Sequence, residues 1–558
     1  MMNEAHSQKI GGIKHEIITQ TPRGKIILIS FAFVIGVAYR LLMGVQGIDI
    51  TDMGFCMTFY QNIFSHPDAM TFYFNYYLTG FFGGAWNIVM GDYGLMGFRL
   101  FEQLTMASAL LLTLLSFYRW FTSTWVMLAA VLLSFLFPSI IVTFHYDTLS
   151  FFFMSASLYT MMRWLKCNCW WWLTMAGLLI GISFFVRIVN GILGALILLP
   201  FIMGWQQSWK QGLKNACIFG SGLLIGSFLV IGIMLIFGHL NCFVKALEEA
   251  YSTFNGQETS HTSSNLISVY LNSYVNISIQ VLALVLIGLF NKFLENKAFL
   301  LRVLTRVFLL VVLFILVATS QPYLSAIAAC SLLSFVCFKQ MESQQRWLIL
   351  YAAACAYLFP FGSDIGIPGI FHWCAGLFVI PAATCYQLLK ESWKRQMVWG
   401  ISLSIALCML YKMSNAAYGE EEPRYKTTTM AISGTLNVMT TEERARLYQN
   451  EVARIKEYAA GDSLLLIANQ ASELYYATGM LPFTGNTQIG VFIGETLASQ
   501  LDRQVERHGR FPLVVFIHRS NFTDEMEEFR QSLRPWMKRH HYQTIYADTD
   551  IELYKPNF

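Results

Sequence analysis

The sequence predicts an α-helical protein that crosses a membrane many times and carries a soluble α/β domain at its C-terminal end. Of its 558 residues, 55% are apolar and only 13% are charged, whereas a soluble domain is about 25% charged. Apolar stretches recur between residues 26 and 411, separated by short polar connections. Spans of about 20 residues fit into this length many times, which excludes a simple anchor. The net charge is only +4 without a basic cluster, which argues against a nucleic-acid partner.

Thirteen apolar stretches are expected to cross the membrane. They follow a cytoplasmic tail of residues 1–25 and precede a soluble domain of residues 413–558, so that residues 26–412 form the membrane region. Several are shorter than the roughly 20 residues that cross hydrocarbon without thinning the bilayer. The stretches are residues 26–45, 98–118, 125–144, 148–162, 170–186, 188–205, 216–237, 266–290, 303–319, 323–338, 347–361, 370–389 and 397–411.

The distribution of basic residues predicts the orientation of the chain. With the N-terminus inside and thirteen crossings, 18 of the 23 Lys and Arg residues before position 413 fall on the cytoplasmic side. Positive charge in short loops marks that side of a membrane. We therefore expect a multi-pass protein of a bacterial inner membrane, with its C-terminal domain in the periplasm or an equivalent outer space.

The segment after residue 412 has the composition of a soluble domain, with 15 basic and 19 acidic residues. Residues 440–443 read Thr-Thr-Glu-Glu, a capping box that predicts a helix as far as about residue 458. Apolar runs and periodicity predict the other elements. These are buried strands at residues 463–468 and 512–518, a helix at 525–538, and a closing strand or hairpin at 543–554.

An unusually long outer loop, residues 46–97, separates the first two predicted spans. It contains the run Asp49-Ile50-Thr51-Asp52-Met53-Gly54-Phe55 and a Tyr/Phe-rich stretch. A purely connecting loop needs neither this length nor so many aromatic residues. We expect amphipathic helices that lie on the outer leaflet and cover a cavity.

Acidic residues gather on the predicted outer side, where nine of the fifteen before position 413 fall. Most such carboxylates only cap helices or face water. Asp52 departs from this pattern, because it follows a span closely, lies three residues from Asp49 and precedes Gly54 and an aromatic residue.

With these residues the sequence resembles the GT-C superfamily of integral-membrane glycosyltransferases, such as its mannosyltransferases and aminoarabinose transferases, which take sugars from polyprenyl-phosphate carriers. The resemblance covers the membrane region as architecture, through short motifs. It implies a large helical bundle, a catalytic acid in the first outer loop and often a soluble C-terminal domain. The sequence departs from the family in lacking an Asp-Glu pair and in offering Arg187 instead of a clear lysine for the phosphate. The motifs are residues 49–55, 91–100, 144–150, 176–181 running into Arg187, and 362–366.

The resemblance implies transfer of a sugar from a polyprenyl-phosphate donor to a lipid, glycan or protein acceptor, with inversion. Such a displacement needs a carboxylate that takes the proton of the acceptor hydroxyl and cations that stabilise the departing phosphate. Asp52 is the expected base, with Asp49 as second choice or as its partner. Arg187 is the best candidate for the phosphate, because an arginine at membrane depth is costly without an anion.

Two more arginines on the outer side are candidates for the phosphate. Arg99 lies three residues before Glu102, so that a structural ion pair explains it about as well as phosphate binding does. Arg40 is the other cation on that side that orientation does not explain. Asp92, in the motif that enters the second span, is a further candidate for substrate contact.

Two outer turns complete the candidate site. His145 and Asp147 flank a tight turn, where the alternative is that Asp147 only caps a helix. Ser363 and Asp364 lie between two glycines in a late outer loop, which could be only a flexible turn.

No cofactor is predicted from the sequence. Asp49 and Asp52 could help to hold Mg²⁺ or Mn²⁺, but two carboxylates are a poor site for ions that take six oxygen ligands. A divalent metal therefore stays open.

Three other functions stay open beside the glycosyltransferase. A lipid-linked oligosaccharide polymerase or ligase has a similar number of helices but usually places its long outer loop late in the chain. A secondary transporter shows two repeated halves and polar residues near the membrane midplane, and no such repeat occurs here. A non-catalytic scaffold would keep the fold without the donor.

Overall fold

A computed structural model describes most of the chain. The described residues are 22–48, 52–136, 143–255, 262–294, 322–363, 365–367, 373–389, 411, 415, 417–420, 422–430, 435–459, 464–468, 471–487, 495–518 and 524–557. The predicted span at residues 303–319 lies outside them, as does that at 397–411 apart from residue 411.

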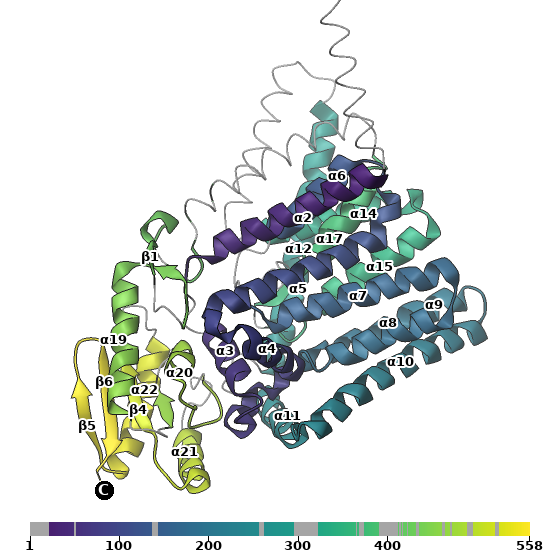
Figure 1. Cartoon of the computed structure of the whole chain (residues 1–558). Coiled ribbons are helices and arrows are strands. Elements are labelled where there is room, and N and C mark those ends of the chain that lie inside the picture. Colours follow the sequence, from purple (N-terminus) through teal and green to yellow (C-terminus); the bar gives the residue numbers. More distant parts are fainter. Residues whose placement is uncertain are drawn as a thin grey trace, which may run out of the picture.

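The membrane region is a bundle of roughly aligned helices (Figure 1). Long apolar stretches form these helices, and the described helices fall on eleven of the thirteen predicted stretches. They are α2 (Pro22–Gly44), α5 (Gly94–Phe117), α6 (Thr124–Leu136), α7 (Tyr146–Cys167), α8 (Trp170–Ser183), the 3₁₀ helix η4 (Ile188–Ile197) with α9 (Leu198–Trp205), α10 (Trp209–Ile236), α12 (Ser263–Leu294), α14 (Pro322–Cys337), α15 (Ser343–Leu358) and α17 (Gly376–Tyr386). Short 3₁₀ turns, η3 (Tyr118–Trp120) and η5 (Phe338–Gln340), follow α5 and α14.

Five segments among the described residues are long and apolar enough to cross a membrane by length and composition: Arg23–Gly44, Pro67–Trp120, Ile188–Trp205, Trp209–Ile236 and Ser263–Leu286. Shorter apolar helices, including α6, α8 and α17, add to these segments. The architecture is that of the predicted multi-pass helical protein.

Glycines bring α8 and α10 into close contact. A Cβ at Gly177 would lie 2.0 Å from the carbonyl oxygen of Phe219, and one at Gly222 would lie 1.9 Å from that of Thr174. Small residues four apart allow this approach of two membrane helices. The glycine motif at residues 176–181 thus packs two helices and places Arg187, which follows α8.

The predicted outer loop is helical, but its first helix is buried. It consists of α3 (Asp52–Asn62), η1 (Pro67–Tyr76), α4 (Tyr77–Met90) and η2 (Gly91–Tyr93). Nine of the eleven residues of α3 are buried. The expectation of amphipathic helices on the membrane surface is therefore wrong for α3, because the C-terminal domain covers the side that would face water.

The C-terminal domain is the predicted α/β unit. Its four-stranded sheet has the order β3-β4-β6-β5, with β3 parallel to β4 and the other pairs antiparallel. The hydroxyl of Thr441 accepts from the amide of Arg444 and begins α19, which confirms the predicted helix, although its N-cap is Thr441 and the residue three positions later is Arg444 instead of the glutamate of a capping box. The strands are β3 (Leu465–Ile467), β4 (Leu513–Ile517), β5 (Tyr542–Ala547) and β6 (Ile551–Pro556), and the helices are α19 (Glu442–Tyr458), α20 (Glu473–Thr478), α21 (Glu495–His508) and α22 (Asp524–Arg539).

Smaller elements tie this domain to the bundle. The strands β1 (Thr429–Met430) and β2 (Met439–Thr440) form a two-stranded sheet after the 3₁₀ turn η6 (Arg424–Lys426). The amide of Gly47, just beyond α2, donates to the carbonyl of Met439 at 2.8 Å, and the side chain of Gln46 donates to that of Thr427 at 2.7 Å. The domain therefore begins against the outer end of α2. The helix α11 (Leu240–Asn255) packs against η1 at the same end of the bundle.

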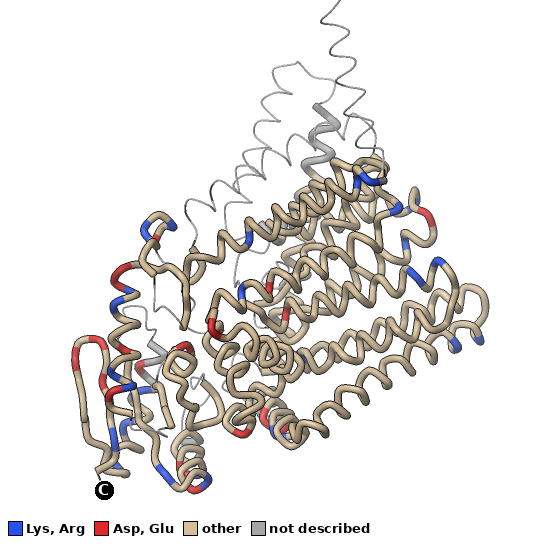
Figure 2. The backbone as a smooth tube through the Cα atoms, viewed as in Figure 1, with Lys and Arg blue, Asp and Glu red and all other residues tan. Residues whose placement is uncertain are grey.

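Charge divides the bundle into two ends. Figure 2 shows Lys and Arg at the helix ends remote from the C-terminal domain. There Arg119, after α5, pairs with Glu342, before α15, at 3.3 Å. The predicted orientation would place this basic end in the cytoplasm.

Candidate functional site

A buried ion pair lies at the end of the bundle that faces the C-terminal domain. The Arg187 guanidinium donates from Nη1 to Oδ1 of Asp147 at 3.2 Å. Both side chains are buried, with 7% and 4% of their surfaces exposed. Asp147 is in the first turn of α7, and Arg187 is the extended residue before η4. The sequence places these two residues forty positions apart, and the fold brings them together.

His145 joins the same cluster. Its Nδ1 lies 3.4 Å from Oδ2 of Asp147, and the ring is 3% exposed. Its Nε2 is buried and makes no hydrogen bond to the described residues. The N-cap of α7 is His145 and not Asp147, as the alternative interpretation had it. The His145 side chain accepts from the Asp147 amide at 3.5 Å.

Aromatic rings enclose this cluster. Tyr146 stacks on Tyr76 of the outer loop, with ring centroids 4.2 Å apart and planes 9° from parallel. The Arg187 guanidinium lies 5.6 Å from the centre of the Tyr146 ring and 5.7 Å from that of Phe359, after α15. Trp373 stacks on His145 at 5.4 Å. Flat rings of this kind lower the cost of holding a cation away from water.

Asp52 approaches the cluster from the outer loop. It is the first residue of α3 and is half-buried. Its carboxylate lies within range of electrostatic interaction with the Tyr146 hydroxyl. One turn later on α3, the ring of Phe55 lies 6.4 Å from both His145 and Tyr76. The helix that begins with Asp52 therefore contacts the cluster of His145 and Tyr76 through Phe55.

A second buried polar layer lies deeper in the bundle. Glu102 of α5 accepts from the Thr148 hydroxyl at 2.6 Å, and Arg40 of α2 donates to Gln103 at 3.1 Å. Arg40, Glu102 and Gln103 are almost completely buried. Arg40 thus lies within the bundle and beneath the site.

Arg99 binds backbone carbonyls at the end of α2. It is completely buried and donates to the carbonyls of Gly44 and Gly47, the latter at 2.7 Å. Cations at the carboxyl end of a helix satisfy its terminal carbonyls. Arg99 therefore fixes the end of α2 and the beginning of the outer loop.

The remaining predicted residues divide into three groups. Asp92 is exposed on η2 and faces the C-terminal domain, where burial and the Asp92 carboxylate raise the pKa of Tyr476 to about 12. Ser363 is buried. Its neighbour Gly362 lies so close to Val189 that a Cβ added at Gly362 would be 2.7 Å from the Val189 side chain. This places the late outer loop beside the residues after Arg187. Asp49 and Asp364 lie outside the described residues.

The C-terminal domain forms a roof over the first helix of the outer loop. A Cβ at Gly54, two residues after Asp52, would lie 2.1 Å from the amide nitrogen of Glu473 in α20. The hydroxyl of Tyr73 lies 2.7 Å from Asn486 Oδ1 and 2.6 Å from Thr487 Oγ1. Side chains of α3, η1 and this domain share one hydrophobic core. The roof therefore holds α3, and with it Asp52, in place.

Several residues near the cluster were not predicted from the sequence. Tyr76, Tyr146, Phe359 and Trp373 are aromatic residues in an aromatic-rich chain, so that only their spatial convergence distinguishes them. Glu102, which the sequence offers as a possible ion-pair partner of Arg99, accepts from the Thr148 hydroxyl, a contact that the sequence does not predict.

A metal site is not apparent in the described part of the chain, in which no three His, Cys, Asp or Glu residues converge. Asp49, which could share a divalent ion with Asp52, lies outside the described residues.

The bundle, its helical outer loop and its terminal α/β domain define a multi-pass helical membrane protein with an appended α/β domain. Among solved structures, the chain is similar to ArnT from Cupriavidus metallidurans bound to undecaprenyl phosphate, with a TM-score of 0.50 and 13% identity over 95% of this chain and 97% of that chain. The apo state of ArnT gives a TM-score of 0.44 and 12% identity over the same shares. No protein-family model and no curated protein matches the sequence. The likeness to the lipid-bound structure confirms the predicted resemblance at the level of the fold.

Proposed function

We propose that this protein is a membrane glycosyltransferase that moves a sugar from a polyprenyl-phosphate donor to an acceptor on the outer side of the membrane. One observation carries the proposal: a buried Arg187–Asp147 pair lies beside Tyr146 and His145 at one end of the bundle, and α3, which begins with Asp52, contacts this cluster through Phe55. A sugar phosphate that enters sideways from the bilayer would meet both.

Arg187 is suited to the phosphate of the donor. Its bond to Asp147 uses one of the five N–H groups of the guanidinium. Asp147 offsets the cost of burying the cation before the donor arrives, and the remaining donors can meet a phosphate in a bidentate manner. As the bond between sugar and phosphate breaks, charge grows on the leaving phosphate, where a fixed cation stabilises it most.

Asp52 is suited to the acceptor. In the proposed step the acceptor hydroxyl oxygen attacks the anomeric carbon, its proton passes to the Asp52 carboxylate, and the bonding electrons of the broken C–O bond leave with polyprenyl phosphate. Attack from the face opposite the phosphate inverts the anomeric centre. His145, with its buried Nε2, is the group we assign to a hydroxyl or phosphate oxygen of the substrate.

The fold supports the class of donor. The ArnT structure of similar fold is bound to undecaprenyl phosphate, which is a polyprenyl phosphate. The acceptor, whether lipid, glycan or protein, has no corresponding support. The position of the long outer loop in the chain favours a transferase over a polymerase or ligase. The helical loop that carries Asp52 follows the first predicted span, whereas a polymerase or ligase usually has its long loop late in the chain. The polar cluster at one end of the bundle, rather than at its centre, argues against a transporter.

The proposal is tested with the purified full-length protein and a panel of polyprenyl-phosphate sugars. The measured quantity is acceptor-dependent release of polyprenyl phosphate, with crude membrane extract as the source of acceptor. We expect release from at least one donor and inversion at the anomeric carbon of the product. Absence of release from every donor, with a folded protein, would contradict the proposal.

A further inference from the structure

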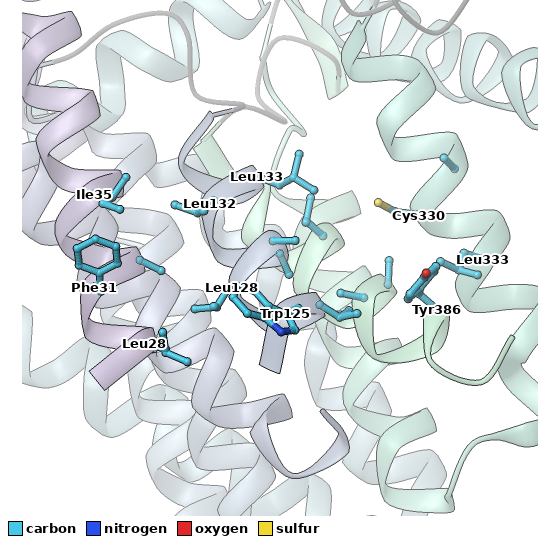
Figure 3. Close-up of a pocket in the computed structure, with 18 residues that line it drawn as sticks. Leu28, Phe31, Ile35, Trp125, Leu128, Leu132, Leu133, Cys330, Leu333 and Tyr386 are labelled. Atoms are coloured by element: carbon cyan, nitrogen blue, oxygen red, sulfur yellow. The ribbon is translucent and has the colours of Figure 1, made fainter. Parts of the chain in front are cut away.

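An apolar cavity of about 710 Å³ lies in the half of the bundle remote from the candidate site. Four helices form its walls: α2, α6, α14 and α17. Figure 3 shows the side chains that line it, among them Phe31 of α2, Trp125 of α6, Cys330 of α14 and Tyr386 of α17. All belong to helices whose other ends point toward the C-terminal domain or the site.

The cavity exists because small residues face it. Ala129, Ala329 and Ala383 line it from three different helices, and no charged residue does. A space of this size in a well-packed protein forfeits dispersion contacts. An apolar cavity also does not hold water. In a membrane, hydrocarbon is the material that can fill it.

The cavity is open to the bilayer. Phe31 and Trp125, at its edge, expose 62% and 59% of their surfaces. Both helices carry these residues in the half that begins at the basic end of the bundle. A chain that enters here therefore comes from the leaflet at the basic end.

Two of the four helices, α2 and α14, carry cations beyond their lining residues, at the end at which such a chain would have its headgroup. Arg23 and Lys25 precede Leu28, the first lining residue of α2, by five and three positions. Lys339 follows Leu333, the last lining residue of α14, by six positions. Arg23 and Lys339 are exposed. Basic residues at a membrane surface attract anionic headgroups at about 1 kcal/mol each.

We infer that this groove binds one acyl chain of an anionic glycerophospholipid, whose phosphate lies near Arg23 and Lys25. The chain fills the space between α2 and α6 on one side and α14 and α17 on the other, and it holds the two parts of the bundle together. The site is separate from the proposed active site, where Arg187 takes the phosphate of the donor.

Native mass spectrometry of the full-length protein tests this inference. Protein freed of lipid in mild detergent is titrated with phosphatidylglycerol, with phosphatidylcholine of the same chains and with undecaprenyl phosphate. We expect one tightly bound phosphatidylglycerol, and binding of phosphatidylcholine that is at least about tenfold weaker. Ala129→Phe, which fills the groove, should abolish the tight adduct, whereas the matched change Gly232→Phe should keep it, because a Cβ at Gly232 of α10 meets nothing within 4 Å.

A second variant covers the case in which Ala129→Phe does not fold. The pair Arg23→Gln and Lys25→Gln should remove the preference for phosphatidylglycerol over phosphatidylcholine while either lipid still binds. Equal binding of the two lipids by the unaltered protein would overturn the inference, as would a tight adduct that survives in a folded Ala129→Phe variant. Preferential filling of the groove by undecaprenyl phosphate, shown by its loss in Ala129→Phe, would overturn it as well.

Discussion

Asp147 and Arg187 show how two charges are kept in a part of the protein that water does not reach. Each side chain is more than nine-tenths buried. Removing one partner of such a pair leaves a buried charge, which costs about 3–5 kcal/mol, although the pair itself adds little net stability. The pair lies beside His145, Tyr146 and Tyr76, in the cluster that we assign to the substrate.

The first prediction concerns this pair. Asp147→Ala should lower the free energy of unfolding by about 3 kcal/mol, because Arg187 is left without its carboxylate. Asp147→Ala combined with Arg187→Leu should recover most of that loss, since no unpaired charge remains. Unfolding in mixed detergent measures both variants. If the double variant is no more stable than Asp147→Ala, the assignment of a coupled pair is wrong.

At the scale of elements, the contact between α3 and α20 connects the two regions of the protein. It depends on Gly54, where the α20 backbone comes so close that a methyl group has no room. The free space that a side chain would need is taken by the Glu473 amide. This contact holds the helix that begins with Asp52.

The second prediction tests that contact. Gly54→Ala should destabilise the protein by about 1–3 kcal/mol, as overpacking does, and should lower turnover because α3 shifts. Gly232→Ala on α10 is the matched control. It should be neutral or raise stability by about 0.5–1 kcal/mol, as alanine does in a helix, because its Cβ meets nothing. Thermal unfolding measures the stability of both variants. An equal change in stability in Gly54→Ala and Gly232→Ala would contradict the close contact between Gly54 and α20.

The third prediction concerns the hairpin of β5 and β6. Partial burial opposes ionisation of Asp548, but hydrogen bonds from the Tyr546 hydroxyl and the amides of Asp550 and Ile551 lower its pKa to about 2. The ordinary aspartate pKa is about 3.9, so the ionised group stabilises the fold above about pH 4 and this contribution is lost as pH falls toward 2.

Thermal unfolding between pH 4.5 and 2 should show this loss. In Asp548→Asn the decrease in melting temperature over this range should be smaller, because the titrating group is absent. A decrease of the same size in both proteins would show that Asp548 is not responsible.

At the scale of the whole molecule, the separation of charge leads to the fourth prediction. The basic helix ends lie remote from the C-terminal domain (Figure 2), and basic loops stay in the cytoplasm. An alkaline phosphatase reporter fused at residue 411 should therefore be active outside the cell membrane, whereas one fused at Arg119 should be inactive. The reverse pattern would place the proposed site on the cytoplasmic side.

Much of the fold could be predicted from the sequence, because it rests on local patterns. Apolar length, a capping threonine at Thr441 and alternation near the C-terminus each determine an element within a few residues. The burial of α3 could not be predicted, because it depends on a contact between Gly54 and Glu473, more than 400 positions apart.

The candidate site was predictable only in part. Asp147 and Arg187 stood out as charges at the ends of apolar runs, but their pairing required the fold. Arg99 stood out for the same reason, yet its carbonyl partners at Gly44 and Gly47 give it a structural environment. A charge at a membrane boundary therefore predicts a partner, and only the structure tells whether that partner is a backbone, a side chain or a space for substrate.

In the proposed reaction, Asp52 and Arg187 serve one substrate in different ways. Binding of polyprenyl phosphate is compared with its release in Asp52→Asn, in Arg187→Gln and in the control Asp68→Asn, since the Asp68 side chain, in the first turn of η1, is 72% exposed. Asp52→Asn should lose at least about 100-fold in turnover, the usual contribution of a general base, and keep its affinity for polyprenyl phosphate. Arg187→Gln should lose affinity as well as turnover, and Asp68→Asn should retain both. Undiminished turnover in a folded Asp52→Asn protein, or unchanged affinity in Arg187→Gln, would contradict the account.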